Sequence, residues 1–493
     1  MELEKKMEIL RILRVFNPWW ETGRIDNVEP FERLDLSALK NKLEDNEIIT
    51  IVGARQVGKT TMMEQVVKHL LLHEDPRRIL FVIADNTGLN AVSKNLIEDS
   101  ILVHQEFVLK EELNRSSRRI FVLIDEVQKI ENWAQTIKSW YDINKKIKFL
   151  ISGSSSTKII SESTKPFVGR AVNQMVVPFK FFECVRYDNF RKGDLNWSLN
   201  KMKTDLIKKF MEIACKKDAG KEDIDSIFSG FREIHKNLAI DENKIKGLLN
   251  EYMVKGGYPG IVKEPDMKKC AELLTTNYKD VINSDIKNVY SIRKPQLMES
   301  LLTIMSRNTG QILNLVDICN DLGEGMALIR EYIGFLMDAF ILSVSENYLY
   351  SRSTTVRKKI KKFYVNDTGM RNVVNNSFSD IVMQDGNELG RLVETIVFNH
   401  CLRLKFKMTG KHKPEMFYWR KDDEEIDIML DCGAHAIPIE VKYRNNIDKK
   451  DIRPICDYVE SGKAPFGFVI TIDKLEMDGK IIFVPLWLFL LMV

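Results

Sequence analysis

The sequence predicts an α/β protein in which two α/β regions flank a mainly helical middle. From about residue 46 to residue 178, short apolar runs rich in β-branched residues alternate with helical stretches. Runs that are apolar throughout are typical of parallel strands buried on both faces of a sheet. Residues 186–250 lose this pattern and become rich in lysine and glutamate, whereas residues 388–493 alternate helix and strand again. The predicted strands of the first region are Ile48–Val52, Ile79–Ile83, Ile120–Ile124 and Phe149–Ile151.

A chain of 493 residues exceeds what one hydrophobic core usually holds, and its length predicts about three domains. The pattern along the chain refines this to four ranges. We expect a parallel-sheet domain with an N-terminal helix in residues 1–185 and a helical lid or insertion in residues 186–289. Residues 290–375 are predicted as three helices and two short strands, the order of a winged helix-turn-helix. Residues 376–493 are expected to form the second α/β domain.

The composition is that of a globular protein. Hydrophobic residues make up 44% and charged residues 29%, which disfavours a disordered chain or a membrane protein. The net charge of +4 does not by itself indicate nucleic acid, so any such surface requires local clustering of basic residues. The seven cysteines include no CxxC pair, which disfavours a secreted disulfide framework or a structural zinc site and favours a reducing cytoplasm.

Both ends of the sequence carry apolar or aromatic residues that need an explanation. Met1–Lys6 leads into a charged amphipathic pattern rather than a signal peptide. The paired tryptophans of Asn17-Pro18-Trp19-Trp20 are expected to clamp the N-terminal helix onto its domain. The final ten residues, VPLWLFLLMV, are half the length of a membrane span and predict a buried last element. We therefore expect a cytoplasmic protein without a membrane segment.

A phosphate-binding motif follows the first predicted strand. The pattern GxxxxGK[ST] is matched in full by Gly53, Ala54, Arg55, Gln56, Val57, Gly58, Lys59 and Thr60. Glycines let the backbone wrap the phosphates, and the N–H groups of the loop and of the following helix point at the anion. Lys59 is expected to bridge the β- and γ-phosphates, and Thr60 to bind Mg²⁺. The sequence thus predicts a nucleotide site that extends to Thr61 at the start of the helix.

A second motif lies at the end of another buried strand, where Asp125 and Glu126 follow Ile120–Ile124. We expect Asp125 to reach the metal ion and Glu126 to polarise the attacking water. A DE pair at a strand end is often only a polar terminus, but after a phosphate loop it predicts hydrolysis as well as binding. The sequence has no guanine-reading NKxD motif, so ATP is preferred to GTP.

Two further candidates remain open on the sequence alone. Ser152-Gly153-Ser154 ends a predicted strand and either senses the γ-phosphate or simply forms a turn. Arg170 either supplies a charge-neutralising guanidinium, in cis or from a neighbouring subunit, or is an exposed structural arginine.

Several motifs together resemble a known family. They are the NPWW opening, ARQVGKTT, LIDEVQK, ISGSSS, VGR before VVPFKFFE, KGGYPG at 255–260 and NDTGM at 366–370. The chain resembles AAA+-type P-loop ATPases of bacteria and archaea, and more closely the family that joins such an ATPase to a C-terminal nuclease-like domain of unknown function. The resemblance covers nearly the whole chain and implies assembly into homo-oligomers, but it supplies no substrate.

The C-terminal region holds a second set of candidate catalytic residues. Residues two apart on a strand face the same side, so Glu440 and Lys442 point together in the strand around IPIEVK. Asp427 lies on the preceding strand and Glu394 in a predicted helix. Two carboxylates can hold Mg²⁺ or Mn²⁺, and the lysine can orient a water or stabilise charge at phosphorus.

This arrangement resembles the PD-(D/E)xK nuclease core. The resemblance places Asp427, Glu440 and Lys442 on its motif positions and Glu394 on its helical acidic position, with Glu394, Asp427 and Glu440 as metal ligands. E-x-K on a strand is also a common surface pattern, and a nuclease-type fold does not guarantee cleavage.

The winged-helix region adds a basic segment. Residues 351–362 contain six basic side chains and no acid, which can contact phosphates from a wing or form a solvated edge. The six residues are Arg352, Arg357, Lys358, Lys359, Lys361 and Lys362.

The sequence therefore predicts a P-loop AAA+-like ATPase domain, a helical and winged-helix middle and a C-terminal PD-(D/E)xK-like domain. The main hypothesis is an ATP-hydrolysing protein that binds or acts on DNA, with metal-dependent phosphodiester cleavage at the C-terminal site. The alternative is a nucleotide-dependent switch whose winged helix and inactive nuclease fold only bind DNA or a protein partner. A third possibility is a chaperone-like remodeller acting on protein.

Overall fold

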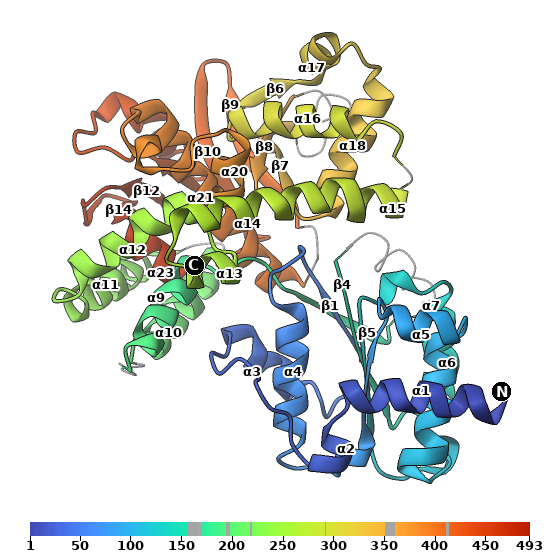
Figure 1. Ribbon diagram of the computed structural model, residues 1–493. Coiled ribbons are helices and arrows are strands. Elements are labelled where there is room, and N and C mark those ends of the chain that lie inside the picture. The colour runs from blue at the N-terminus through green and yellow to red at the C-terminus, as the bar shows by residue number, and fades with distance from the viewer. Residues whose placement is uncertain are drawn as a thin grey trace. The chain divides into compact units, whose positions relative to one another are not determined.

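The computed structural model describes residues 1–154, 167, 169–193, 198–216, 219–290, 292–350, 360–410 and 414–493. These residues form two compact units, Met1–Val177 and Pro178–Val493, which are drawn with their elements in Figure 1. The boundary lies close to the end of the first predicted range, 1–185. The division of the remaining chain into the ranges 186–289, 290–375 and 376–493 stays a prediction.

The first unit contains the parallel sheet that the apolar runs predict. Its strand order is β2-β3-β4-β1-β5, and each neighbouring pair is parallel. All four predicted runs form strands, and one further strand adds to the edge. The strands are β1 (Ile48–Val52), β2 (Ile79–Ile83), β3 (Ile120–Asp125), β4 (Ile147–Gly153) and β5 (Ala171–Met175).

Helices cover both faces of this sheet. Figure 1 shows α3 and α4 on one side, and α1, α5, α6 and α7 on the other. Covering both faces explains why the central strands are apolar along their whole length. The helices are α1 (Leu3–Phe16), α2 (Trp19–Thr22), α3 (Leu34–Asn41), α4 (Lys59–Leu70), α5 (Thr87–Val92), α6 (Leu96–Val103) and α7 (Trp133–Ile143), with a π-helix at His104–Leu109.

The NPWW segment clamps the N-terminal helix onto the sheet, as predicted. The side chain of Asn17 donates to the carbonyl of Phe81 at 2.9 Å and accepts from its N–H at 2.6 Å, so it pairs with edge strand β2. The indole N–H groups of Trp19 and Trp20 donate to the carbonyl of Ile79 at 3.1 and 2.8 Å. The segment thereby covers an otherwise open strand edge.

The second unit is built on a nine-stranded mixed sheet with the order β13-β14-β12-β11-β10-β9-β7-β8-β6. The strands predicted for the winged-helix region continue into the C-terminal sheet, because β7 pairs in parallel with β9. The strands are β6 (Ile312–Asn314), β7 (Leu342–Asn347), β8 (Ile360–Val365), β9 (Met416–Lys421), β10 (Glu424–Asp431), β11 (Ala436–Val441), β12 (Gly467–Thr471), β13 (Glu476–Asp478) and β14 (Ile481–Pro485).

Helices make up most of the rest of this unit, and the helical prediction for residues 186–250 is confirmed by α10, α11 and α12. The predicted apolar positions Leu206, Phe210, Ile213, Ile227 and Phe231 are all buried. The helices up to the middle are α9 (Phe181–Arg191), α10 (Ser198–Ala214), α11 (Lys221–Asn237), α12 (Glu242–Lys255), α13 (Pro259–Lys263), α14 (Met267–Asp280), α15 (Lys287–Tyr290), α16 (Pro295–Arg307), α17 (Leu315–Leu322) and α18 (Met326–Asp338), with a π-helix at Val281–Ile286. The later helices are α20 (Thr368–Val374), α21 (Gly386–Thr409), α22 (Arg453–Glu460) and α23 (Leu486–Met492).

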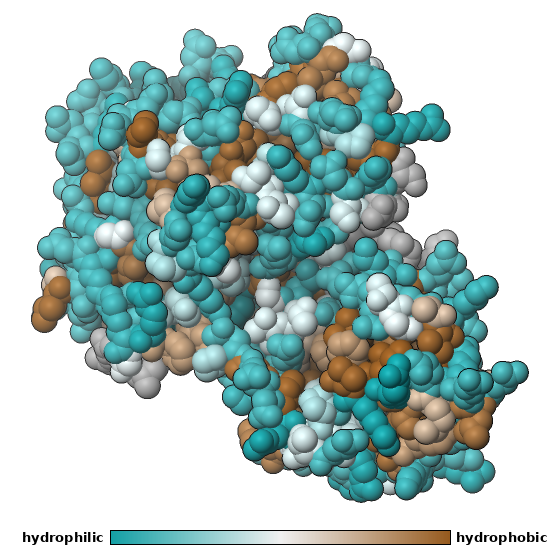
Figure 2. Space-filling view, in the orientation of Figure 1, coloured by the Kyte–Doolittle hydropathy of each residue, from teal (hydrophilic) through white to brown (hydrophobic). Residues whose placement is uncertain are grey.

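The apolar C-terminal segment is a buried element, as predicted. Helix α23 follows β14, and every residue from Leu486 to Val493 is at most 2% exposed. The helix packs against α9, α10, α11 and α12. Among the described residues, no helix is both long and apolar enough to cross a membrane. Figure 2 shows hydrophilic side chains over most of the visible face of each unit, with apolar side chains in smaller patches.

Two motifs of the family resemblance, KGGYPG and NDTGM, pack against each other in the second unit. The Asp367 carboxylate accepts from the N–H of Gly257 at 2.7 Å and caps α20 through the N–H of Met370 at 2.9 Å. Gly256 has a φ of +73°, and a Cβ there would lie 2.3 Å from the Asp367 carboxylate. A Cβ on Gly369 would lie 2.0 Å from the carbonyl oxygen of Lys255. The glycines therefore allow a close backbone approach, which gives both motifs a structural role.

Candidate functional site

The phosphate loop joins β1 to α4, and its glycines meet specific steric demands. A Cβ on Gly53 would lie 1.8 Å from the carbonyl oxygen of Val176, so no larger residue fits without moving the backbone. Gly58 precedes the helix with a φ of +92°, a left-handed conformation that favours glycine. The loop thus turns directly into the N-terminus of a twelve-residue helix, where backbone N–H groups favour an anion.

Two cations bind the carbonyl groups of this loop. The ammonium of Lys59 donates to the carbonyls of Gly53 at 3.1 Å and Ala54 at 2.9 Å. The guanidinium of Arg33 donates to the carbonyls of Val57 at 3.1 Å and Val177 at 2.8 Å. Sequence reasoning missed Arg33 because it belongs to no motif and is separated from the loop in sequence by α3, an irregular segment and β1.

Asp125 lies at the carboxyl end of β3, where the parallel register brings it beside the phosphate loop. Thr60 Oγ1 donates to Asp125 Oδ2 at 2.5 Å, and the Ser152 hydroxyl donates to Oδ1. Burial raises the pKa of Asp125, as does the charge of Glu126, whereas the hydrogen bonds from Ser152 and Thr60 lower it. The structure therefore joins the predicted residues Thr60, Asp125 and Ser152 in one hydrogen-bonded group.

Glu126 follows Asp125, and its φ of +54° ends the extended backbone of β3. Its carboxylate accepts from the Gln128 side chain and from Ser154 Oγ at 3.4 Å, and Gln128 also donates to Ser154 Oγ at 3.0 Å. The Ser152 and Ser154 hydroxyls thus lie beside the two acids, which the γ-phosphate-sensor interpretation requires. Gln128 was missed by sequence reasoning, although its position two residues after Glu126 in the DEVQK motif was a usable signal.

Arg170 lies at the other edge of the sheet. It precedes β5, which runs parallel to β1, and its carbonyl accepts from the N–H of Ile48 at the amino end of β1. Its guanidinium is 3.8 Å from the Asp142 carboxylate. The phosphate loop leaves the carboxyl end of β1, whereas Arg170 precedes β5 at the amino end of the sheet, and the cis role of Arg170 stays a prediction. The trans contact stays a prediction.

The donor set at the phosphate loop fits Mg²⁺. A threonine hydroxyl and a buried carboxylate are hard oxygen ligands, which this ion prefers together with phosphate oxygens and water. Thr60 and Asp125 provide these groups within one hydrogen bond of each other.

The C-terminal candidates also converge, on neighbouring strands of the second unit. Asp427 on β10 and Glu440 on β11 lie next to each other: Asp427 Oδ2 accepts from the N–H of Val441 at 2.8 Å, and the N–H of Asp427 donates to Glu440 Oε2 at 3.3 Å. Lys442 forms an ion pair with Glu440. Burial raises the pKa of Glu440, as does the nearby Asp427 carboxylate. The spacing argument for Asp427, Glu440 and Lys442 therefore gave the right neighbours.

Glu394 on α21 joins this group through Lys362, not through a shared carboxylate contact. Lys362 Nζ lies 2.6 Å from Glu425 Oε1, 3.1 Å from Glu394 Oε1 and 3.9 Å from Asp427 Oδ1. Tyr364 donates its hydroxyl to Glu394 Oε1 at 2.7 Å. Burial raises the pKa of Glu394 to about 7, while the Lys362 ammonium acts in the opposite direction.

The prediction that Lys362 contacts phosphates from a wing is wrong. Its side chain is only 2% exposed, because β8 lies between β6 and β7 and directs it to the carboxylates. Lys361 pairs with Glu346 at 2.8 Å. The remaining basic residues of this segment, Arg352, Arg357, Lys358 and Lys359, lie outside the described residues.

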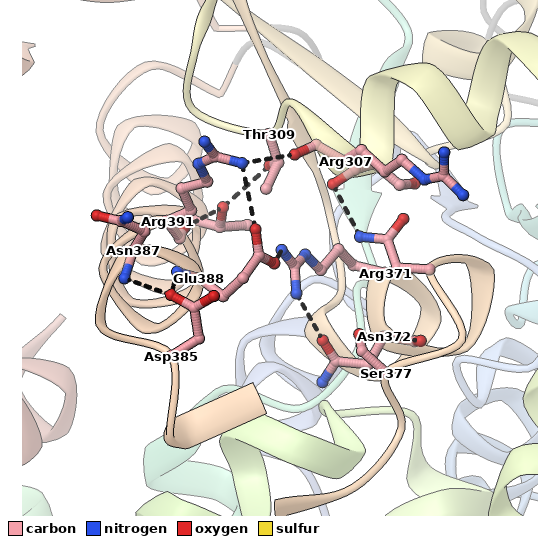
Figure 3. Close-up of polar contacts among 12 residues, drawn as sticks. Arg307, Thr309, Arg371, Asn372, Ser377, Asp385, Asn387, Glu388 and Arg391 are labelled. Carbon is pink, nitrogen blue, oxygen red and sulfur yellow. Dashed lines mark hydrogen bonds and ion pairs between the residues drawn. The ribbon is translucent and has the colours of Figure 1, made fainter. Parts of the chain in front are cut away.

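The helix that carries Glu394 is anchored at its N-terminal end by a polar cluster (Figure 3). The side chains of Arg371 and Arg391 converge on Glu388, with Arg391 Nη1 at 3.2 Å from its carboxylate. Arg391 also donates to the carbonyl of Arg307 at the end of α16, at 3.2 Å. One turn further along α21, the Thr395 hydroxyl lies 3.0 Å from the Thr309 hydroxyl. These contacts fix the position of Glu394 against Gly310.

The C-terminal residues do not fit a divalent cation in this arrangement. Across the described parts of the chain, no group of three or more His, Cys, Asp or Glu side chains is placed to hold a metal ion. At the predicted site, an ammonium group lies among the carboxylates instead.

Two of the three helices of the predicted winged helix-turn-helix carry more acidic than basic residues. The element order α16, α17, α18, β7, β8 agrees with the sequence expectation, with β6 pairing with β8 as an additional strand. The exposed charged residues of helices α17 and α18 are one base, Arg330, and the acids Asp317, Asp321 and Glu331. A surface that contacts DNA phosphates is normally basic, so these two helices do not favour DNA.

Comparisons with known proteins assign the first unit. Residues 45–185 match the family described as "AAA domain", which covers the phosphate loop, Asp125 and Glu126. Residues 246–380 and 389–489 match two families described as domains of unknown function, DUF8612 and DUF4143. The match to residues 45–185 supports a P-loop, AAA+-like ATPase domain in the first unit.

Relatives with similar length occur in an archaeon. The chain is 25% identical over 451 residues to the uncharacterized protein MJ1544 of Methanocaldococcus jannaschii, which covers 90% of this chain and 86% of that protein. It is 23% identical over 484 residues to MJ1637 of the same organism, which covers 94% of this chain and 89% of that protein.

Among solved structures, the Walker-type ATPase PABY2304 of Pyrococcus abyssi is 15% identical with a TM-score of 0.39, over 71% of this chain and 97% of that one. No conclusion about function follows from this structural likeness.

Proposed function

We propose that this protein is an ATP-hydrolysing nucleotide switch whose second unit binds a partner without cutting nucleic acid. The observation that carries the ATPase part is the hydrogen-bonded group of Thr60, Asp125 and Ser152 beside the phosphate loop, with Glu126 next in sequence. Such a group supplies a metal ligand pair and a candidate base at the same sheet edge as the phosphate cradle.

The residues of the loop divide the work of binding and catalysis. The N–H groups from Gly53 to Thr61 and the N-terminus of α4 bind the phosphates, and Lys59 exchanges its carbonyl partners for phosphate oxygens. Thr60 and Asp125 would hold Mg²⁺, which neutralises charge on the phosphates. Glu126 orients the attacking water and accepts its proton, while Gln128 and Ser154 fix the direction of its carboxylate.

Metal-dependent cleavage by the second unit is the competing hypothesis, and the convergence of Asp427, Glu440 and Lys442 favours it. Two other observations support binding without cleavage. The ammonium of Lys362 faces Glu394 and Asp427, two of the three carboxylates that the metal would need. The acidic surface of α17 and α18 further favours a protein partner over DNA.

The decisive experiment compares ATP binding with ATP turnover. Glu126→Gln keeps the size of the side chain and its contact with Gln128 but removes the base, so ATP affinity should stay unchanged while turnover falls roughly 10²- to 10⁴-fold. Lys59→Ala should instead weaken ATP binding. Glu131→Gln, at an exposed position nearby, serves as the matched control and should behave like the wild type. Normal turnover in Glu126→Gln would refute the assignment of this base.

A further inference from the structure

Four carboxylates and two ammonium groups gather at one place in the second unit, and we call this set the carboxylate cluster. Its residues lie on β8, on α21, on the consecutive strands β10 and β11, and directly after β11. The carboxylates belong to Glu394, Glu425, Asp427 and Glu440, and the ammonium groups to Lys362 and Lys442.

Lys362 takes the position of a cation in this cluster. Its distances of 2.6 Å to Glu425 and 3.1 Å to Glu394 are those of charge-assisted hydrogen bonds, and Asp427 lies at 3.9 Å. A divalent cation bound by carboxylates requires oxygen atoms at roughly 2.0–2.6 Å, so at Glu394 and Asp427 it would need oxygen atoms that already face the ammonium. The two cations therefore exclude each other unless the lysine withdraws.

The fold holds Lys362 in this place from several directions. Its backbone is paired on both sides, with Ile312 of β6 and with Ser345 of β7. This differs from a lysine at a solvated strand edge, which can move its ammonium freely into water.

Glu394 is fixed toward the ammonium in the same way. Tyr364 donates to its carboxylate at 2.7 Å, and Gly310 leaves room for it, since a Cβ there would lie 3.2 Å from the carboxylate. The arrangement thus depends on a hydroxyl and a missing side chain as well as on charge.

We infer that Lys362 is the resident cation of the carboxylate cluster and keeps divalent metal ions out of it. This inference rests on the proposed function of the second unit as a binding module, and it specifies how a nuclease-type arrangement is kept without metal. The two lysines offset half of the formal charge of the four carboxylates. The cluster is in this respect an internal ion network.

The inference is tested by titrating Mn²⁺ into the full-length protein without nucleotide, with free Mn²⁺ measured by electron paramagnetic resonance. Wild type and Asp427→Asn should give the same titration, because the cluster contributes no metal site. Lys362→Met removes the ammonium at similar side-chain length and should bind Mn²⁺ at least about tenfold more tightly than wild type. Lys362→Arg keeps the charge and should show no gain.

Two results would overturn the inference. One is Mn²⁺ binding by the wild type that disappears in Asp427→Asn, which needs no variant at Lys362 and decides the question even if Lys362→Met does not fold. The other is a folded Lys362→Met protein, judged by circular dichroism, with wild-type Mn²⁺ affinity. Both readouts are independent of ATP turnover, so a failure here is distinguishable from a failure of the ATPase assignment.

Discussion

The cations at the two candidate sites have different partners. At the phosphate loop, Lys59 and Arg33 donate to backbone carbonyl groups, at distances between 2.8 and 3.1 Å. In the second unit, Lys362 and Lys442 donate to carboxylates instead. Carbonyl groups satisfy the hydrogen bonds of a cation without cancelling its charge, whereas carboxylates cancel it.

This difference separates a site prepared for ligands from a site whose carboxylates are already paired with ammonium groups. Near the phosphate loop, the hydrogen bonds to Asp125 come from two hydroxyls and a backbone N–H, so its negative charge is still available to a metal ion. In the carboxylate cluster, Lys362 and Lys442 already offset half of the formal charge of the four acids. Similar residue types thus give different chemistry because their partners differ.

The largest expected effect of a single substitution is in the ATPase unit, at Gly53 of the phosphate loop. Gly53→Ala places a methyl group where the carbonyl of Val176 lies, at 1.8 Å, and because that neighbour is backbone the loop must move. We expect a loss of stability of the first unit of about 3 kcal/mol or more, together with loss of ATP binding. Thermal unfolding and binding of a fluorescent ATP analogue measure the two effects.

The matched control for this change is Gly247→Ala in the second unit. An added Cβ there meets no atom within 4 Å, and the residue is exposed within α12. Alanine should therefore be neutral or stabilise the helix by up to about 1 kcal/mol. If Gly53→Ala binds ATP like the wild type, the loop is not as tightly enclosed as the structure indicates.

The residues of the phosphate loop could be recognised because a strand, a glycine loop and a helix are continuous in sequence. Asp125 could be placed beside them, although it is distant in sequence, because it ends the buried strand β3 and the carboxyl ends of parallel strands meet at one edge of the sheet. The position of Arg170 was also within reach, since a residue before a parallel strand must lie at the amino edge of the sheet.

The role of Lys362 could not be predicted in the same way. It depends on the pairing of β8 with β6 and β7 and of β7 with β9, which places residue 362 beside residues that follow it by up to 65 positions, at Asp427. Sequence spacing does not reveal such long-range pairing, and a lysine in a basic run is usually assigned to the surface. The contacts of Glu394 were missed for the same reason.

In the second unit, the pH dependence of stability tests the environment of the buried Glu394 carboxyl group. Burial raises the folded-state pKa of Glu394 from 4.5 to about 7. A raised pKa stabilises the folded state below the unfolded value of 4.5, and this contribution is lost as the pH rises through about 7. Glu394→Gln removes the titration, so its stability relative to wild type should increase between pH 5 and pH 8, by at most about 3 kcal/mol.

Calorimetric unfolding at several pH values measures this difference. The transition of the first unit can be identified because Gly53→Ala shifts it, which leaves the other transition for the second unit. Glu460→Gln, at an exposed position of α22, is the control for replacing one acid by its amide. A difference for Glu394→Gln that does not vary with pH would contradict the raised pKa.

The smallest expected effect tests whether hydroxyl groups support Asp125 in the ATPase unit. Thr60→Val preserves the shape of the side chain but removes the donor to the Asp125 carboxylate and the predicted metal ligand. A hydrogen bond to a charged group contributes roughly 1.5–3 kcal/mol, so ATP turnover at a fixed Mg²⁺ concentration should fall roughly 10- to 100-fold. Thr60→Ser keeps the hydroxyl and should retain most of the activity. Because both variants leave Lys59 and the loop N–H groups in place, their ATP affinity without Mg²⁺ should match the wild type. Wild-type turnover in Thr60→Val would mean that Ser152 alone positions Asp125 and that the Thr60 hydroxyl is not needed as a donor or as a metal ligand.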